Sequence, residues 1–304
     1  MMRSQMPGVR RQPYCMIALA IVLGSCTPLL AQTPDAAYRA EFQKWQQEQV
    51  KDLKDNWLPL IGLFWLKEGE NTFGSAKGSA IELPASSAPA RAGVVVRKGK
   101  EVAIKVADGA KVTTNGKPVR EAKLVASPPG PPTVLELGSL RMFVVQRGNR
   151  FALRVKDMRN PAINEFKGLQ TYPLNQAYIV TADFVAAKDK TMGLTDVLGD
   201  VRQVPVPGEV RFRLNGQELR LTPIEGENGT LFFTFSDLTR KKDTYPGGRF
   251  LGAPAPKNGK VVLDFNKAYS PPCAWTPYAT CPLPPKQNQL QVEIPAGEKY
   301  AGHH

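Results

Sequence analysis

Short segments in which apolar and polar residues alternate follow one another along most of this chain. Alternation with a period of two places every second side chain on the same face of a strand, so these segments predict β-strands. Glycine, proline and asparagine between them are typical of turns. The predicted strands are Ala80–Leu83, Gly93–Arg97, Val102–Val106, Lys111–Thr114, Val134–Leu137, Arg141–Gln146, Phe151–Val155, Glu209–Leu214, Gln217–Thr222, Thr230–Phe235, Arg249–Leu251, Lys260–Phe265 and Leu290–Ile294.

The spacing of these segments predicts how they assemble. The regular succession up to about residue 155 is typical of a β-sandwich. Further along, Asn215-Gly216 lies between two alternating segments and is the sequence signature of a two-residue type I′ hairpin turn. This hairpin begins a second antiparallel β structure, which is either a barrel or a sandwich with one face in solvent.

The segment Ala36–Asp55 has the pattern of a helix, and Pro34-Asp35 is a suitable start. Its large apolar residues recur on one face and form a stripe of Tyr38, Phe42, Trp45 and Leu53. We expect the stripe to pack on a sheet, and binding of a partner is the alternative. The apolar run Trp57–Leu66 then predicts a buried strand pair or one strand that bends at Pro59.

The fold class predicted from these patterns is all-β: two β-sandwich or barrel domains preceded by one helix. The 27 prolines and 26 glycines favour short strands and turns over long helices. The span Thr191–Val204 has the composition of a loop, and we place a domain boundary near Leu169–Tyr172. The expected organisation is a leader (1–31), the helix (32–56), a first β domain (57–170) and a second (171–304).

Residues 57–155 resemble a forkhead-associated (FHA) sandwich. The resemblance rests on Gly69-x-Asn71-x-Phe73-Gly74, Ile81-x-Leu83, Asn115-Gly116-Lys117-Pro118-Val119 and Leu135-x-Leu137-Gly138-Ser139-Leu140. In that family an arginine after the first glycine and a Ser-x-x-His pair hold phosphothreonine. Here Ser75 follows Gly74, no histidine lies between residues 57 and 156, and Arg91 is the one cation on the expected loop. The resemblance therefore implies the scaffold without phosphothreonine binding.

Nearly all of the chain after the leader resembles the bacterial family DUF1684, a domain of unknown function. The motifs are Trp57-Leu58, Gly62–Gly69, Asp237-Leu238-Thr239, Thr244–Leu251, Leu263–Tyr269, Pro271–Ala274 and Tyr278–Pro285. This resemblance implies no activity, cofactor or site residue.

Residues 1–31 have the features of an export signal, because a basic start precedes the short apolar run Met16–Leu23. That run is shorter than the about 20 apolar residues that cross a bilayer. Two cleavage sites remain open. Leu23–Cys26 resembles a bacterial lipobox, which would make Cys26 a lipidated membrane tether, and Ala31 ends an ordinary signal-peptidase site. The mature protein is expected to be periplasmic, anchored to the outer membrane as a lipoprotein, or secreted.

The formal net charge is +13, of which the leader's arginines contribute three, so 13 − 3 = +10 remains. The basic residues are dispersed, and the densest run is Arg240–Lys242. Dispersed charge predicts a solvated basic surface and no nucleic-acid partner.

The proline-rich segment Val261–Pro285 is expected to form an ordered lid across the second β domain, since disordered segments lack its aromatic residues. It contains Cys273 and Cys281. In an exported protein such a pair predicts a disulfide. A thiol nucleophile is an alternative that lacks a histidine base, and a metal site is one that lacks further ligands. We expect no metal and no cofactor.

The chain has two histidines, His303 and His304. Their position at the C-terminus argues against Ser-His-Asp and Cys-His catalysis and against multi-histidine zinc sites. There is no Gly-x-Ser-x-Gly elbow and no phosphate-binding Gly-x-x-x-x-Gly-Lys loop. The candidate ligand-binding residues that remain are Arg249, Asp264, Asn266, Tyr269 and Tyr278.

Two interpretations of these candidates stay open. A buried Arg249–Asp264 ion pair would fasten the proline-rich segment to the sheet. Alternatively, the residues line a pocket in which Arg249 holds an anionic group and the aromatic rings stack on the ligand.

Two functions follow. The first is a non-catalytic extracytoplasmic protein that binds a cell-envelope ligand or a protein partner. The second is an enzyme acting on a polar or anionic substrate, with Asp264 as acid or base, Arg249 as the orienting cation and Asp237 as the second acid. Exposure of Arg249 and Asp264 in a pocket would favour the enzyme, and enclosure would favour the scaffold.

Overall fold

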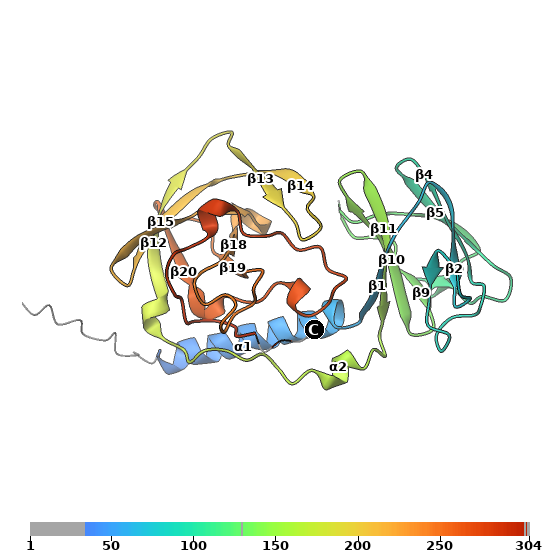
Figure 1. The fold of residues 1–304 in the computed structure, drawn as a ribbon, viewed down its shortest axis with the longest axis horizontal. Helices are drawn as coiled ribbons and strands as arrows, with labels where there is room; N and C mark the ends of the chain where they lie inside the picture. The colour runs from blue at the N-terminus through green and yellow to red at the C-terminus, as the bar shows by residue number, and fades with distance from the viewer. Residues whose placement is uncertain (1–33, 129, 301, 303–304) are drawn as a thin grey trace, which may run out of the picture. The chain divides into compact units, whose positions relative to one another are not determined.

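The computed structural model describes residues 34–128, 130–300 and 302. The predicted leader, Cys26 and both cleavage sites lie outside the described residues. Within them the chain is mostly strands with one long helix near its beginning (Figure 1), so the predicted all-β class with an N-terminal helix is confirmed. None of the described helices is long and apolar enough to cross a membrane.

Helix α1 spans Ala36–Asp52 and continues into a π-helical turn at Leu53–Trp57. It begins where predicted, because the Asp35 carboxylate accepts a hydrogen bond of 2.8 Å from the Tyr38 amide and so caps the first turn. Phe42 is buried at 4% exposure, as expected for an aromatic stripe packed against the protein.

The first β-region, here called the N-terminal sandwich, consists of two sheets. The first has the order β1 (Leu60–Trp65), β11 (Arg150–Asp157), β10 (Leu140–Arg147), β9 (Leu135–Leu137), β6 (Thr113–Thr114) and β7 (Lys117–Pro118). The second has the order β3 (Ile81–Glu82), β2 (Gly69–Gly74), β4 (Gly93–Lys98), β5 (Glu101–Val106) and β8 (Glu121–Leu124). Alternate residues of both sheets, such as Val95 and Ile104 facing Leu135 and Met142, are fully buried in one core.

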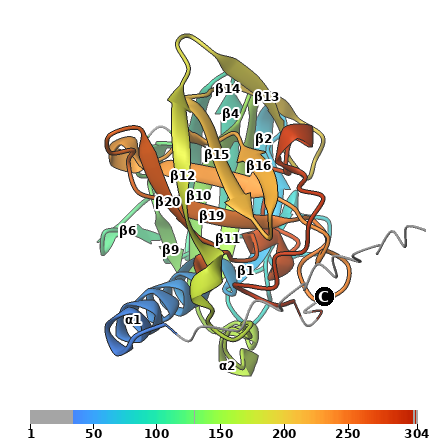
Figure 2. The same ribbon diagram turned by 90° about the vertical axis from the view of Figure 1, so that its left-hand side faces the viewer.

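The second β-region, here called the C-terminal region, has three sheets, and the strands of the largest are labelled in Figure 2. The largest has the order β16 (Gln217–Leu221), β15 (Gly208–Leu214), β12 (Ile179–Ala186) and β20 (Lys260–Asp264). The others are β13 (Thr191–Thr195) with β14 (Val201–Pro205), and β17 (Ile224–Glu225), β18 (Leu231–Phe235) and β19 (Arg249–Ala253). The predicted hairpin turn is confirmed, because Asn215 and Gly216 have φ values of 51° and 77°.

The link between the two regions contains the short helix α2 (Ala162–Glu165) and the 3₁₀ turn Gln176–Tyr178. Separate hydrophobic clusters lie on its two sides, one within residues 66–155 and one within 178–296. The predicted boundary near Leu169–Tyr172 stays a prediction.

Three of the predicted segments have different structures. In Trp57–Leu66 there is neither a strand pair nor a strand bent at Pro59, because Trp57 ends the π-helical turn and the single strand β1 begins only at Leu60. Thr191–Val204 forms the hairpin β13–β14. The sequence did not predict these strands because only Leu194 and Val204 are buried, so the segment lacks an alternating apolar pattern. Leu290–Ile294 is no strand, although Leu290, Val292 and Ile294 are buried. The segment beside it, residues 236–238, leads into a turn and is not a strand. The Leu290 amide donates to the Ser236 carbonyl, and the Val292 carbonyl accepts from the Leu238 amide. The Ile294 carbonyl accepts a hydrogen bond of 3.0 Å from the Arg249 side chain.

Arg249 and Asp237 form an ion pair in which both side chains are 1% exposed. Arg249 also donates to the carbonyls of Ile294 and Ala296, and its guanidinium lies 5.2 Å from the centre of the Phe235 ring. The predicted pairing of Arg249 with Asp264 is therefore wrong. The Asp237 carboxylate, in the turn after β18, reaches Arg249, and the carbonyls of Ile294 and Ala296 accept further hydrogen bonds from its two terminal nitrogens, whereas its Nε has no partner among the described residues.

We predict that Arg249→Met lowers the free energy of unfolding by about 3–5 kcal/mol, because it leaves the Asp237 carboxylate buried without its partner. Urea unfolding followed by tryptophan fluorescence measures this. Lys260→Met removes a cation from an exposed pair with Asp183 and should cost about 0–1 kcal/mol. Equal losses in the two variants would contradict the importance of the buried pair.

Candidate functional site

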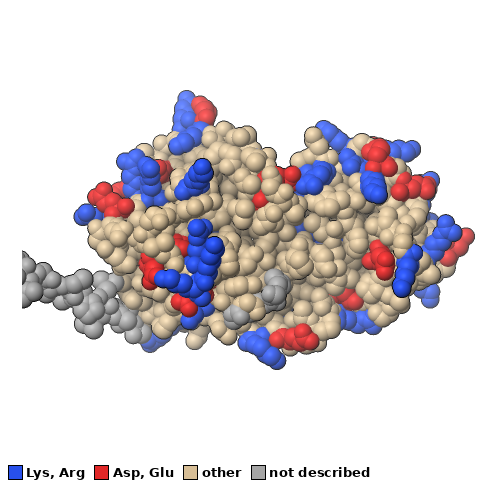
Figure 3. All heavy atoms as spheres, viewed as in Figure 1, with Lys and Arg blue, Asp and Glu red and all other residues tan. Residues whose placement is uncertain are grey.

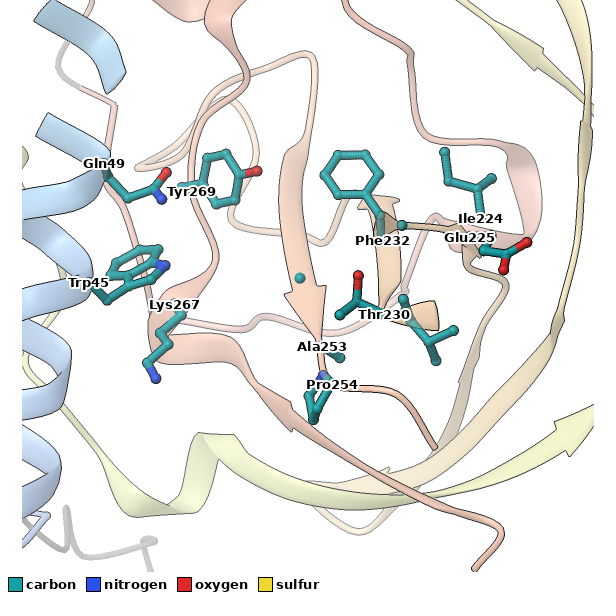
Figure 4. A pocket seen from close by; sticks show the side chains of 13 residues that line it. Trp45, Gln49, Ile224, Glu225, Thr230, Phe232, Ala253, Pro254, Lys267 and Tyr269 are labelled. Carbon is teal, nitrogen blue, oxygen red and sulfur yellow. The ribbon is translucent and has the colours of Figure 1, made fainter. Parts of the chain in front are cut away.

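A pocket of about 590 Å³ opens between α1 and the C-terminal region. Trp45 and Gln49 of α1 and Tyr269 line one side, and Ile224 and Phe232 line the other (Figure 4). Glu225, Thr230 and Lys267 supply polar groups at its edges. The pocket is wide open to solvent, and its volume lies in the range of small-molecule sites.

The aromatic residues Trp45, Tyr269 and Phe232 that line the pocket, here called the aromatic wall, are linked by edge-to-face contacts, in part through Phe250, which does not itself line the pocket. The ring of Tyr269 lies 6.3 Å from that of Trp45 and 5.8 Å from that of Phe250, and Phe250 lies 5.0 Å from Phe232. Reciprocal backbone hydrogen bonds of 2.8 and 3.0 Å between Phe250 and Tyr269 fix the central pair. Such contacts favour one ring arrangement, so the wall is formed before any ligand arrives.

Polar contacts fasten α1 beside this wall. The Tyr38 hydroxyl donates to the Asp264 carboxylate, with distances of 3.0 and 2.9 Å to its two oxygens. Lys267 pairs with Glu41 of the helix and lies 3.7 Å from Asp264. Burial raises the pKa of Asp264, and the hydrogen bond from Tyr38 opposes that shift. Asp264 therefore holds the helix that forms one side of the pocket.

The five predicted ligand-binding residues do not form one site in the structure. Tyr269 lines the pocket, and Asp264 supports it from outside. Asn266 is 1% exposed and exchanges two hydrogen bonds of 3.1 Å with the backbone of Asn175, which gives it a structural role. Arg249 is enclosed, and Tyr278 is half-buried and does not line the pocket.

Cys273 and Cys281 are not joined to each other in this structure, and the predicted disulfide stays a prediction. They are adjacent: the Cys273 amide lies 3.1 Å from the Cys281 sulfur, and the Cys281 amide lies 3.3 Å from the Cys273 sulfur. A hydrogen bond between the side chains lowers the pKa of Cys273 and raises that of Cys281. The buried Arg154 of β11 approaches the same segment, since its Nη2 lies 3.5 Å from the Tyr278 carbonyl.

Sequence reasoning missed a buried carboxyl group beside the pocket. Glu298 is 3% exposed, and its Oε2 accepts from the Ser270 amide at 3.1 Å. Burial raises the pKa of Glu298 to about 7. Gly297 places it there: with φ of 79°, this residue passes so close to Ala268 that a Cβ would lie 2.4 Å from the Ala268 carbonyl oxygen. No local pattern in the sequence identifies Glu298, because its surroundings come from distant segments.

Two larger openings, of about 820 and 720 Å³, have a different character. Their walls are rich in charged side chains that pair with each other, such as Arg213 with Glu218 and Arg150 with Asp200. Exposed pairs of this kind are typical of solvated surface. The aromatic pocket is therefore the stronger candidate.

Comparison with known proteins confirms the resemblance to DUF1684 over residues 164–299, and the family is described as "Protein of unknown function". No curated protein matches the chain. Among solved structures, an uncharacterized protein of Haloarcula marismortui is 29% identical, with 46% of this chain and 80% of that chain covered and a TM-score of 0.39.

FHA domains are also similar, as the sequence predicted. One, from a study of phosphothreonine-dependent FHA interactions, is 19% identical over 31% of this chain and 92% of that chain, with a TM-score of 0.23. The FhaA FHA domain is 19% identical over 30% and 96%, with a TM-score of 0.22.

We predict that Glu298 makes the fold less stable as the pH rises. A carboxyl group whose pKa is raised by folding holds its proton more tightly in the native state, so its stabilising contribution is present below about 4.5 and is lost as the pH rises through about 7. Glu298→Gln lacks this loss, and its stability relative to wild type should improve by about 3 kcal/mol between pH 4.5 and 7. Urea unfolding at several pH values measures the difference.

Glu218→Gln, which removes an 82% exposed carboxylate, controls for the loss of one negative charge. If the difference between Glu298→Gln and wild type were independent of pH, the raised pKa of Glu298 would be refuted.

Proposed function

We propose that this chain is an exported, non-catalytic β-protein that binds a cell-envelope ligand in the aromatic pocket beside α1. The observation that carries the proposal is that Trp45, Tyr269 and Phe232 line a pocket of about 590 Å³. Edge-to-face contacts join their rings, and Phe250, which does not line the pocket, links Tyr269 to Phe232. Such a wall binds a flat or ring-containing apolar group by stacking, while Gln49 and Glu225 bind its polar substituents.

The alternative is an enzyme with Asp264 as acid or base and Arg249 as the orienting cation. It has less support, because Arg249 and its partner Asp237 are each 1% exposed and cannot reach a substrate without local opening. Asp264 accepts hydrogen bonds from Tyr38 and Asn266 and lies outside the residues that line the pocket. We therefore take the binding function as the proposal.

Export is part of the proposal and rests on the sequence features of residues 1–31. Lipidation of Cys26 would tether the protein to a membrane, and cleavage after Ala31 would release it. We propose no nucleic-acid partner, since acidic and basic side chains are interspersed on the face shown in Figure 3. Nor do we propose phosphothreonine binding, because Ser75 stands where the FHA family has an arginine.

We also propose that Cys273 and Cys281 form a disulfide after export. Their adjacent positions suit thiol–disulfide exchange with a partner disulfide, in which both cysteines are oxidised to one S–S bond and the partner is reduced to two thiols. The bond would close a loop within the proline-rich segment.

The pocket can be tested by a thermal-shift screen of cell-envelope metabolites. For any ligand found, we predict that Trp45→Ala and Phe232→Ala weaken binding at least about tenfold, since each removes a stacking surface. Trp65→Ala, which removes a half-buried tryptophan that contacts Arg150 in the N-terminal sandwich, should leave affinity unchanged. Equal affinity in all three variants would place the ligand elsewhere.

The disulfide prediction concerns the protein recovered from the exported fraction. Without reductant, its intact mass should be lower by two hydrogen atoms than after reduction, and neither Cys273 nor Cys281 should react with an alkylating agent. Alkylation of both residues in the unreduced exported protein would contradict the bond. Cys273→Ser should leave Cys281 open to alkylation and serves as the control.

A further inference from the structure

A second, much smaller cavity of about 20 Å³ adjoins the aromatic pocket. Gln49 and Tyr269 line both spaces, so the two share part of a wall. A volume of this order holds a group of one or two heavy atoms. The small cavity is therefore suited to one functional group of a larger molecule.

The groups that face this cavity include buried acceptors without partners. Oε1 of Glu298 has no hydrogen-bond partner among the described residues. Oγ of Ser270 makes no hydrogen bond of ordinary geometry there either, although its hydroxyl lies beside the same carboxyl group and lowers the pKa of Glu298; both residues are 3% exposed. A buried polar atom without a partner is costly, and a bound donor would remove that cost.

The remaining lining residues define the charge of the missing donor. Asp52 contributes a second carboxylate, and Trp57, Tyr269 and Trp275 contribute aromatic rings. No lysine or arginine is among the described residues that line it. Carboxylates combined with aromatic faces in a small space recognise cations, and a group with several N–H donors would satisfy both Glu298 and Ser270.

We propose that this cavity binds the primary ammonium group of a ligand whose remainder lies in the aromatic pocket. The inference deepens the proposed function and rests on it, because the adjoining pocket supplies the space for the rest of the molecule. Glu298 is the ion-pair partner, Ser270 accepts a second N–H, and Gln49 and Tyr269, which line both spaces, lie beside the part of the ligand that joins the ammonium group to its remainder.

The ion pair gives binding a definite dependence on pH. Burial raises the pKa of Glu298 to about 7, whereas an alkylammonium group stays protonated from pH 6 to 8. The other titratable groups that face Glu298 are Asp52 and Tyr269, and Arg249 lies near it but is already paired with Asp237. The ionised fraction of Glu298 rises from about one tenth at pH 6 to about nine tenths at pH 8, so affinity should rise about tenfold.

The test compares n-butylamine with n-butanol, an uncharged molecule of similar length. Binding to the full exported chain is measured by NMR titration of the tryptophan indole N–H signals, because Trp57 and Trp275 line the cavity. We expect n-butylamine to bind at least tenfold more tightly than n-butanol at pH 8, and about tenfold more tightly at pH 8 than at pH 6. Glu298→Gln should abolish both differences, and Ser270→Ala should weaken n-butylamine binding while the pH dependence remains.

The outcomes separate this inference from the proposed function. Equal binding of the two molecules to wild type, weakened by Phe232→Ala, would retain the aromatic pocket and overturn the ammonium site. A preference for n-butylamine that persists in Glu298→Gln, or no binding of either molecule to wild type, would also overturn it. A preference that needs Glu298 but is unaffected by Phe232→Ala would support the ammonium site and count against the pocket. If Glu298→Gln does not fold, the wild-type comparison and Ser270→Ala still decide.

Discussion

The enclosed ion pair between Arg249 and Asp237 is the constraint on which the C-terminal region depends. A guanidinium group that is removed from water must find its hydrogen bonds inside the protein. Arg249 finds them on Asp237 and on the carbonyls of Ile294 and Ala296, so it fixes the path of the last described residues against β19. Glu298 and the small cavity follow from that path, since the Glu298 amide then donates to Ala268 at 2.8 Å.

Helix α1 completes the site from the other end of the chain. Tyr38 and Asp264 are 226 positions apart in sequence, yet their hydrogen bonds bring the helix against the end of β20. The same helix supplies Trp45 to the aromatic wall. Packing of α1 against the C-terminal region therefore buries Phe42 and also forms one side of the pocket. The pocket is thus a product of tertiary structure, with no contiguous motif of its own.

Features that depend on local sequence could be predicted, whereas features that depend on contacts between distant segments could not. Period-two alternation identified most strands, because each needs one face in a core, and Asn215-Gly216 identified a turn through its backbone conformation alone. Leu290–Ile294 has the same alternation but no strand beside it, and its Ile294 carbonyl is bonded to a side chain that no local pattern reveals. The choice of Asp237 over Asp264 as partner of Arg249 likewise depends on which turn lies nearer in space.

The left-handed backbone at Gly297 lets Glu298 reach Ser270, which is 28 positions earlier in the sequence. A nascent chain ending before Gly297 can already contain α1, β18, β19 and Tyr269, and hence every wall of the larger pocket. Such a nascent chain lacks Glu298, the carboxylic acid that lines the smaller cavity. Any selectivity that Glu298 confers would therefore be acquired only after the chain has been synthesised past this residue, and a product that ends before Glu298 would bind without discriminating.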